Sequence, residues 1–364
     1  MKISEIIAFL ESVANLSLQE HYDNAGLITG NADWECNGII CSLDSTEDVI
    51  KEAIEKNCNL VVAHHPIIFS GLKKINGKNY IEKTIIAAIK NDIAIYAIHT
   101  NLDNVVDGVS GRMAKMIGLQ NLSVLYPKAD ILKKLFVFVP IDQSTEVRNA
   151  IFAAGAGHIG NYSECSFNAE GTGTFKAGAG SNPYTGKIGE QHHEKELRIE
   201  VIFPAFLENK IVTSMKAAHP YEEVAYDVMA LSNTHPKTGA GVIGELAEYI
   251  EEITFLNQLK SIFGLKVIRH TQLKGKPVKR VALCGGAGSF LISSALGSGA
   301  DVYITADIKY HEFFDANGQI LIADIGHYES EQFTIDLMQE ILELKFPTFA
   351  VLKTTVLTNP VYYC

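Results

Sequence analysis

The sequence contains no Cys-x-x-Cys pair, although it has six cysteines. That absence argues against a cysteine-based zinc site and favours unpaired thiols in a reducing compartment. No apolar run reaches the roughly 18 residues that a membrane-spanning helix needs. Residues 1–7 are amphipathic and lack the apolar core and cleavage site of a secretion signal. We therefore expect a soluble, cytoplasmic protein that does not associate with membranes.

Positive charge is also scarce, because 31 Lys and Arg stand against 42 Asp and Glu, for a formal net charge of -11. A general nucleic-acid binder needs clustered basic residues to neutralise phosphates, so nucleic acid is not an expected partner. An anionic substrate would need a bound cation or a local basic patch. Hydrophobic residues make up 47% of the 364 residues, which indicates a folded chain with room for two or three domains.

Both ends of the chain alternate helical and strand patterns. The first part predicts strands at 38–43, 60–63 and 93–98, and helices at 3–13, 46–56, 80–90 and 109–117. The last part predicts strands at 278–284, 302–305, 320–323 and 349–355, and one long helix at 329–344. Such alternation is typical of βαβ units and parallel or mixed sheets. We expect residues 1–126 and 236–364 to form the two halves of one α/β core.

The middle of the chain has a different pattern, βαβ–loop–βαβ. The predicted strands are 135–140, 197–203 and 224–230, the predicted helices are 145–154 and 206–218, and the glycine-rich tract 155–189 is expected to be a loop. This order predicts a ferredoxin-like α+β domain inserted into the core at residues 127–235. Pro127 and Pro236 interrupt the patterns at its edges. The role of residues 171–189 stays open.

Histidine and carboxylate side chains follow three of the predicted strands in the sequence. In open parallel sheets, ligands bind beyond the carboxyl ends of the strands. His327 and Glu331 are four residues apart, so they share one helical face. His64 and His65 can reach one crevice only if the backbone leaves strand geometry, which the following proline makes plausible. The residues expected to meet in one metal site are His64, His65, Asp103, His327 and Glu331.

Imidazole and carboxylate ligands suit zinc, iron, manganese, cobalt or nickel. Five such groups exceed the needs of one tetrahedral zinc ion. A carboxylate shared by two divalent ions would use all of them, as in two-metal hydrolases that activate water. We expect two ions, with zinc as the first choice of metal. Glu329 and His99 are candidates for moving protons, and His99 and Asp324 could alternatively orient the ligating imidazoles.

These residues also carry a family resemblance. Four motifs resemble those of the GTP cyclohydrolase 1 type 2 homologs, also called Nif-three-like proteins. These motifs are Ala63–Pro66, His99–Asp103, Thr305–His311 and Asp324–Glu331. A fifth motif, His21–Leu27, looks like the N-terminal signature of the family. The middle is similar to the insert of the longer bacterial members, which resembles the PII and CutA folds. His219–Val224 is its clearest piece.

The resemblance implies a dinuclear metal centre whose ligand positions fall on the five residues named above. It also implies a toroidal homohexamer, with the metal sites facing an interior cavity and the inserts capping its openings. The family name implies opening of the GTP ring, and some members are described only as metal-binding proteins of unknown substrate.

Two functions are therefore compatible with the sequence. One is a metal-dependent hydrolase of a nucleotide or related heterocycle, with an unidentified small-molecule substrate. The alternative is a non-enzymatic metal-binding or regulatory assembly whose insert senses a ligand or partner. A DNA-binding ring would also match the implied assembly, but the net charge argues against it. The turn Gly285–Ser289 could cradle a phosphate or simply allow close packing of strand and helix.

Overall fold

The computed structural model describes all 364 residues, which divide into two compact units. Unit 1 comprises residues 1–127 and 237–364, and unit 2 comprises residues 128–236. Unit 2 differs from the expected insert, 127–235, by one residue at each edge. None of the helices combines the length and the apolar composition that a membrane span requires.

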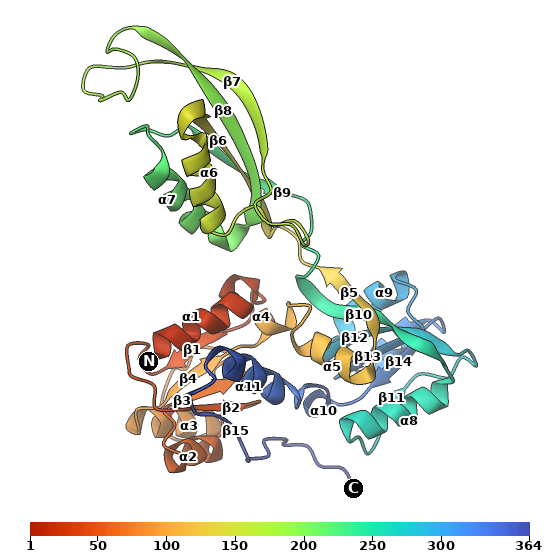
Figure 1. Cartoon of the computed structure of the whole chain (residues 1–364). Coiled ribbons are helices and arrows are strands. Elements are labelled where there is room, and N and C mark those ends of the chain that lie inside the picture. Colours follow the sequence, from red (N-terminus) through yellow and green to blue (C-terminus); the bar gives the residue numbers. More distant parts are fainter. The chain divides into compact units, whose positions relative to one another are not determined.

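The first sheet of unit 1 has five strands in the order β1-β4-β3-β2-β15 (Figure 1). Its strands are β1 (Gly26–Thr29), β2 (Ile39–Ser42), β3 (Leu60–Ala63), β4 (Ala94–Ala97) and β15 (Val351–Lys353). All neighbours are parallel except β1, which runs antiparallel to β4. Every residue of β2, β3 and β4 is buried, because helices cover both faces. Double burial explains the unbroken apolar runs in the sequence.

Four helices cover this first sheet. On one face lie α1 (Ile3–Val13) and α11 (Thr334–Lys345), and on the other lie α2 (Glu47–Glu55) and α3 (Tyr80–Lys90). Each helix contributes buried apolar residues to the core on its side, such as Leu10 of α1 and Ile50 of α2. The predicted helix 46–56 begins one residue later, because Thr46 is its cap and accepts a hydrogen bond from the Val49 N–H.

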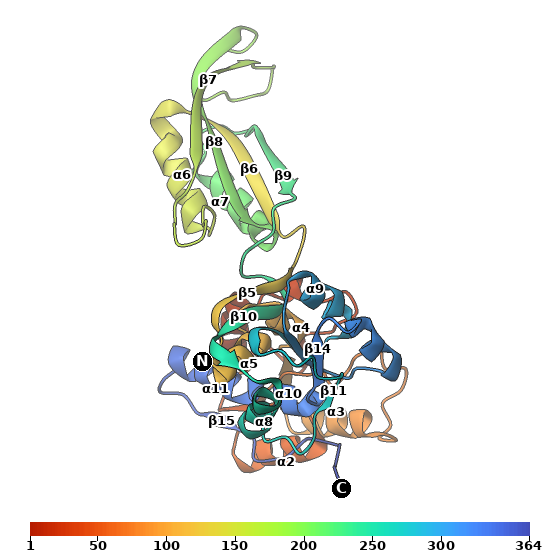
Figure 2. The same ribbon diagram turned by 90° about the vertical axis from the view of Figure 1, so that its right-hand side faces the viewer.

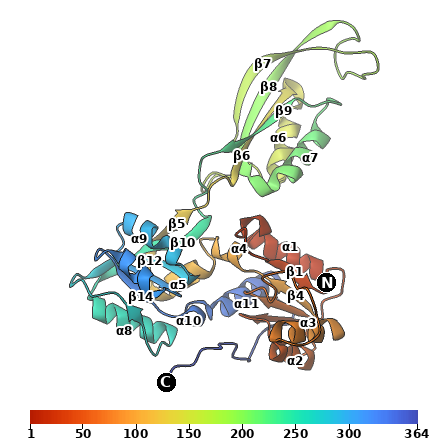
Figure 3. The ribbon, with the colours of Figure 1, turned by 180° about the vertical axis from the view of Figure 1, so that it is seen from behind.

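The second sheet of unit 1 has six strands in the order β11-β14-β13-β12-β10-β5. They are β5 (Gln120–Pro127), β10 (Gly239–Ile250), β11 (Arg269–His270), β12 (Val278–Ala287), β13 (Val302–Ala306) and β14 (Leu321–Asp324). The inner three, β12 to β14, are parallel, and the outer three are antiparallel to their neighbours. Helices α5 (Val109–Ile117) and α8 (Glu252–Phe263) pack on one face, and α9 (Ile292–Gly297) packs on the other (Figure 3). Unit 1 is therefore a mixed α/β structure with parallel and antiparallel pairing.

The two ends of the chain exchange strands between these sheets. β5 belongs to the N-terminal segment but pairs with β10 of the second sheet. β15 lies near the C-terminus but pairs with β2 of the first sheet. Each of the two halves expected from the sequence, 1–126 and 236–364, thus contributes strands to both sheets, and neither sheet is made by one half alone.

The single long helix predicted at 329–344 is partly wrong, because two helices occupy this region. α10 (His327–Glu331) ends before Gln332, and α11 starts at Thr334. Phe333 packs against Phe263 in the core of the second sheet, whereas Ile335 packs in the core of the first. Residues on the two sides of this boundary therefore pack in two different cores.

Unit 2 has the element order β-α-β-β-α-β. Its elements are β6 (Leu132–Pro140), α6 (Ser144–Ala153), β7 (Phe167–Lys176), β8 (Gln191–Pro204), α7 (Glu208–Ala218) and β9 (Tyr226–Leu231). The sheet is fully antiparallel, in the order β7-β8-β6-β9, and the long β7–β8 hairpin is seen from the side in Figure 2. Both helices pack on one face, where Val147 and Ile211 meet Val137 and Ile199.

The loop predicted at 155–189 is partly wrong, because β7 occupies residues 167–176. β7 is an edge strand with little buried surface, so it needs no apolar alternation that a sequence pattern could reveal. Its pairing with β8 runs from Phe167 opposite Glu200 to Lys176 opposite Gln191. Backbone hydrogen bonds rather than side-chain burial therefore define this strand.

Candidate metal centre

His64 lies directly after β3 and is completely buried. Its Nδ1 lies 2.8 Å from the carbonyl oxygen of Ile98, which can only accept, so Nδ1 carries the proton. The lone pair is therefore on Nε2, and this atom is buried without a hydrogen-bond partner. An imidazole held in this tautomer presents an unused ligand atom to the crevice.

Asp103 faces that free nitrogen from the short helix α4 (Thr100–Asp103). Its Oδ1 is also buried without a hydrogen-bond partner and lies 3.7 Å from His64 Nε2. Burial raises the pKa of Asp103 to about 7. Two unpaired acceptors that face each other in a buried place are costly, and a cation between them would satisfy both.

His65 leaves β3 in the same bend and is held at both nitrogens. Nδ1 lies 2.8 Å from Asp44 Oδ1, and Nε2 lies 2.9 Å from Glu331 Oε2. Burial lowers the pKa of His65, but the hydrogen bonds and negative charges of these two carboxylates outweigh it and raise the pKa to about 9. The rings of His64 and His65 have centroids 4.9 Å apart, so the bend brings both to one crevice.

The third part of the cluster is α10, whose four-residue spacing places His327 beside Glu331. His327 Nε2 lies 3.1 Å from Glu331 Oε2, and Nδ1 lies 2.7 Å from Asp307 Oδ2. Burial lowers the pKa of His327, but its hydrogen bonds to the two carboxylates raise it to about 11. The other oxygen of Glu331, Oε1, lies 3.9 Å from His64 Nε2. Glu331 thus presents its two oxygens to different imidazoles.

The glycine turn after β12 makes room for this carboxylate. Gly286 has φ +64°, and a Cβ built on it would lie 2.2 Å from Glu331 Oε1. The Gly286 N–H donates to Ser330 Oγ, and the Gly285 N–H donates to Ser110 Oγ. Because these amides already bond to hydroxyl groups of the protein, the geometry favours the close-packing interpretation of the turn over a phosphate cradle.

His99 lies at the edge of the same group of imidazoles. Its ring centroid is 5.3 Å from that of His64 and 5.4 Å from that of His65. Its Nδ1 lies 2.8 Å from Asp23 Oδ1. Burial raises the pKa of Asp23, but hydrogen bonds from His99 and Thr100 outweigh it and lower the pKa to about 2. The ionised Asp23 therefore fixes the orientation of the His99 ring.

Ligand-type atoms gather in two overlapping groups, each with all its atoms within 4.8 Å of one another. One group comprises His64, His65 and His99, and the other comprises His65, His327 and Glu331. Together with the orphaned atoms of His64 and Asp103, this donor set fits a divalent cation of the zinc or iron type. The structure thus holds a candidate His/Glu metal-binding cluster.

The cluster opens into a pocket of about 680 Å³. His65, His99, Asp103, His327 and Glu331 all line it. Its rim carries four exposed aromatic rings, Tyr22, Phe69, Tyr80 and Phe290. Polar ligand atoms at the bottom and aromatic rings at the mouth suit a flat, polar organic molecule.

Two of the residues singled out in the sequence lie elsewhere. Glu329 turns to the C-terminal segment, where it accepts a hydrogen bond from Asn359 Nδ2 at 3.4 Å, and it lines a neighbouring pocket. Asp324 accepts hydrogen bonds from Arg269 and from the Ile308 N–H. The expectation that Asp324 orients an imidazole of the cluster is therefore wrong.

The sequence did not reveal which carboxylates orient the imidazoles of the cluster. Asp44 orients His65, Asp307 orients His327 and Asp23 orients His99. Asp307 directly follows β13 and Asp44 follows β2 by two residues. The rule that ligand-binding groups follow strand ends could have found both of these.

The chain is similar in sequence to known proteins along most of its length. The model of the Duf34/NIF3 (NGG1p interacting factor 3) family matches residues 1–360. A GTP cyclohydrolase 1 type 2 homolog from Halalkalibacterium halodurans is 40% identical over 99% of both chains, and one from Bacillus subtilis is 39% identical over 89% of this chain and 87% of its own.

Solved structures match over the whole length as well. A Bacillus cereus protein related to NIF3 has a TM-score of 0.87 at 39% identity and covers 100% of this chain and 99% of its own. A Staphylococcus aureus protein has a TM-score of 0.79 at 28% identity with the same coverage. The fold and the relatives lead to one conclusion: the chain belongs to the Duf34/NIF3 family.

Proposed function

We propose that the cluster binds two divalent ions, with zinc as the first choice and iron, manganese, cobalt or nickel as alternatives. The two oxygens of Glu331 support this proposal, because each faces a different set of nitrogens. His64, Asp103 and Glu331 Oε1 would hold one ion. His65, His327 and Glu331 Oε2 would hold the other.

We further propose a metal-dependent hydrolase that acts on a nucleotide or related heterocycle. The observation that carries it is the facing pair of buried, unpartnered atoms, His64 Nε2 and Asp103 Oδ1. Asp103 also lines the aromatic-rimmed pocket. Bound divalent ions supply Lewis acidity and lower the pKa of water. His99, held by Asp23, is placed to accept a proton at Nε2, and the rim aromatics would stack on the heterocycle.

The names of the relatives from Halalkalibacterium halodurans and Bacillus subtilis make GTP the first substrate to test. Metal-loaded protein incubated with GTP should release formate if the heterocycle is opened hydrolytically. His65→Ala should abolish the release, whereas His270→Ala, an exposed histidine on β11, should leave it intact. Formate release that equals the His65→Ala background would contradict GTP as the substrate, and a nucleotide screen with the same pair of variants would then test the wider class.

The metal proposal has its own readout in elemental analysis of protein purified without chelator. Two ions per wild-type chain are expected, and Asp103→Asn should retain one. A wild-type content of one ion or none after metal loading would rule out the dinuclear centre while leaving the family assignment unchanged.

We also propose a toroidal homohexamer in which unit 2 is a ferredoxin-like module of the PII and CutA kind. The resemblance described above and the β-α-β-β-α-β order of unit 2 support the module. Sedimentation should give about six times the chain mass of 39.8 kDa. A monomer or dimer at micromolar concentration would exclude the ring.

A second candidate function is a metal-binding regulatory assembly in which unit 2 senses a ligand. One observation favours it, a pocket of about 690 Å³ confined to unit 2. It predicts bound metal without turnover of any screened nucleotide. Turnover that disappears with His65→Ala would decide in favour of the hydrolase.

A further inference from the structure

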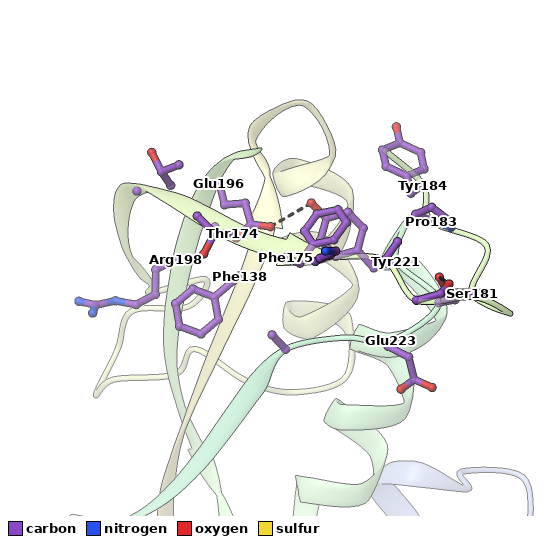
Figure 4. Close-up of a pocket in the computed structure, with 18 of the residues that line it drawn as sticks. Phe138, Thr174, Phe175, Ser181, Pro183, Tyr184, Glu196, Arg198, Tyr221 and Glu223 are labelled. Atoms are coloured by element: carbon purple, nitrogen blue, oxygen red, sulfur yellow. Dashed lines mark hydrogen bonds between the residues drawn. The ribbon is translucent and has the colours of Figure 1, made fainter. Parts of the chain in front are cut away.

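The open face of the unit 2 sheet, opposite α6 and α7, carries a pocket of about 690 Å³ (Figure 4). The metal centre makes no use of it. Its floor is formed by small residues on β7, namely Ala169, Gly171 and Gly173. A Cβ on Gly171 would meet no atom within 4 Å, so the space above this residue belongs to the pocket. The hollow therefore exists because β7 lacks side chains where its neighbours have them.

Glu196 of β8 lies at this floor beside Gly173. A Cβ on Gly173 would lie 2.2 Å from the Glu196 carboxylate, so the glycine makes room for it. Glu196 is only 7% exposed, and its Oε1 accepts a hydrogen bond from the Tyr221 hydroxyl at 2.9 Å (Figure 4). Arg198, two residues further along β8, is bound to Glu200 instead. Burying a carboxylate whose only partner is neutral costs free energy, and a positively charged group beside it would reduce that cost.

Aromatic rings form the walls above this carboxylate. Phe138, Phe175, Tyr184 and Tyr221 line the pocket, and the Tyr221 centroid lies 6.2 Å from that of Phe175 and 6.1 Å from that of Tyr184. The faces of such rings attract cations, most strongly where water is excluded. Aromatic walls around a carboxylate are therefore chemistry for an organic cation.

The charges of the lining point the same way. Four glutamates line the pocket, at positions 170, 196, 222 and 223, against the two basic residues Lys176 and Arg198. The resulting negative balance disfavours a phosphate-bearing ligand such as a nucleotide. It favours a ligand with a positive charge and an apolar body.

We propose that this pocket binds a small organic cation, with its ammonium group at Glu196 and its apolar part against Phe138, Phe175 and Tyr221. The site is separate from the proposed hydrolase and would give unit 2 a ligand of its own. The main competing occupants are a nucleotide and the matching face of a second copy of the chain.

Three probes of one shape and different charge test the ligand class on the full-length protein. Benzylamine is cationic, benzyl alcohol is neutral and benzoate is anionic. Titration calorimetry should show saturable binding of benzylamine, at least about tenfold weaker binding of benzyl alcohol, and no binding of benzoate. Equal or stronger binding of benzoate, or no saturable binding of benzylamine up to about 10 mM, would overturn the proposal.

Variants locate the binding. Glu196→Gln keeps an acceptor for Tyr221 but removes the charge, so it should weaken benzylamine at least about tenfold and leave benzyl alcohol unchanged. Gly171→Val fills the floor and should abolish binding of both probes. Glu146→Gln, an exposed change on α6, should bind like the wild type. Circular dichroism and metal content establish that each variant is folded.

The variants also expose the competing occupants. If Glu196→Gln binds benzylamine as tightly as the wild type, the carboxylate is not the recognition group and the proposal fails. If Gly171→Val changes the oligomeric state in sedimentation without affecting benzylamine, the face is a contact between copies of the chain, which likewise overturns the proposal.

Discussion

Each imidazole of the cluster is oriented by an oxygen on the side away from its neighbours. The oxygens belong to the Ile98 carbonyl for His64, Asp44 for His65, Asp23 for His99 and Asp307 for His327. Such partners fix ring orientation and raise the basicity of the ligand nitrogen. The arrangement is therefore set by the protein before an ion arrives.

Replacing one of these partners should weaken metal binding without removing a ligand. Asp44→Asn keeps the size of the side chain but loses the charge that faces His65, so affinity should fall about 10- to 100-fold. Thr358→Val removes the hydroxyl that donates to Asp44 Oδ2 and should have a smaller effect.

Competition with a chromophoric chelator measures both affinities. Asp48→Asn, an exposed aspartate on α2, is the matched control and should behave like the wild type. An affinity of Asp44→Asn equal to that of the control would show that Asp44 does not orient His65.

At this scale the sequence predicted which residues meet but not what holds them. His64, His65, Asp103, His327 and Glu331 converge because they all follow strand ends, a rule that needs no contact map. The partner of Asp324, in contrast, is Arg269, 55 positions away, and no local pattern connects the two.

Among the elements, the turn after β12 has the least tolerance for change. Gly286→Ala would place a Cβ 2.2 Å from Glu331 Oε1 on a residue with φ +64°. We expect a loss of about 1–3 kcal/mol of stability and a reduced metal content, because Glu331 must move.

Urea unfolding and elemental analysis measure the two effects. Gly297→Ala on α9 is the control, since a Cβ there meets open space and φ is not positive. Full metal content in Gly286→Ala would show that the Glu331 carboxylate can bind metal despite the added Cβ.

The link between α2 and the C-terminal segment should depend on pH. Glu52 accepts hydrogen bonds from Thr354 and Thr355. Burial raises the pKa of Glu52, but these hydrogen bonds outweigh burial and lower the pKa below the usual value for a glutamate. A lowered pKa in the folded state means that the stabilisation is present above the unfolded pKa and is lost as pH falls through the folded one.

Glu52→Gln should therefore lower the free energy of unfolding at pH 7 by about 1–2 kcal/mol, and its difference from the wild type should shrink below about pH 4. Urea unfolding at several pH values measures this difference. Glu55→Gln, exposed on the same helix, should have little effect at any of them. A difference that grows on acidification would contradict the assignment.

Elements were predictable where burial imposes a pattern. β3 spans residues 60–63 as predicted, because an inner parallel strand is apolar throughout. β7 was missed because it is an exposed edge strand. The break after Glu331 was missed because a helical pattern does not say which core each turn faces.

For the whole molecule, the position at which unit 2 is inserted should allow unit 2 to be removed without disturbing unit 1. Pro127 of β5 is paired with Gly239 of β10, so the chain enters and leaves unit 2 at neighbouring positions of one antiparallel pair. Lys237 accepts a hydrogen bond from the Val106 N–H, which ties the returning chain to unit 1.

Replacing residues 128–236 with Asn-Gly should therefore leave unit 1 folded, because Asn-Gly, Lys237 and Thr238 would form a four-residue hairpin loop. Elemental analysis should give the metal content of the full chain, since every proposed ligand lies in unit 1. Loss of metal from a folded excised protein would show that unit 2 is needed at the centre.

The exchange of β5 and β15 between the sheets could not be predicted from the sequence. Alternation indicates that a segment is a strand, and pairing partners follow only from packing of the whole unit. The mixed α/β class was predictable, because it depends on the order of elements rather than on their partners.

Because residues from both ends of the chain form the candidate metal centre, the order of protein synthesis determines when this centre can form. His65 and Glu331 are 266 positions apart, and ribosomes add about 5–20 residues per second. His65 therefore waits roughly 13–50 s for its carboxylate partner. A nascent chain that ends before α10 carries His64, His65, His99 and Asp103 without Glu331, so the proposed two-ion centre can be completed only after α10 has been synthesised.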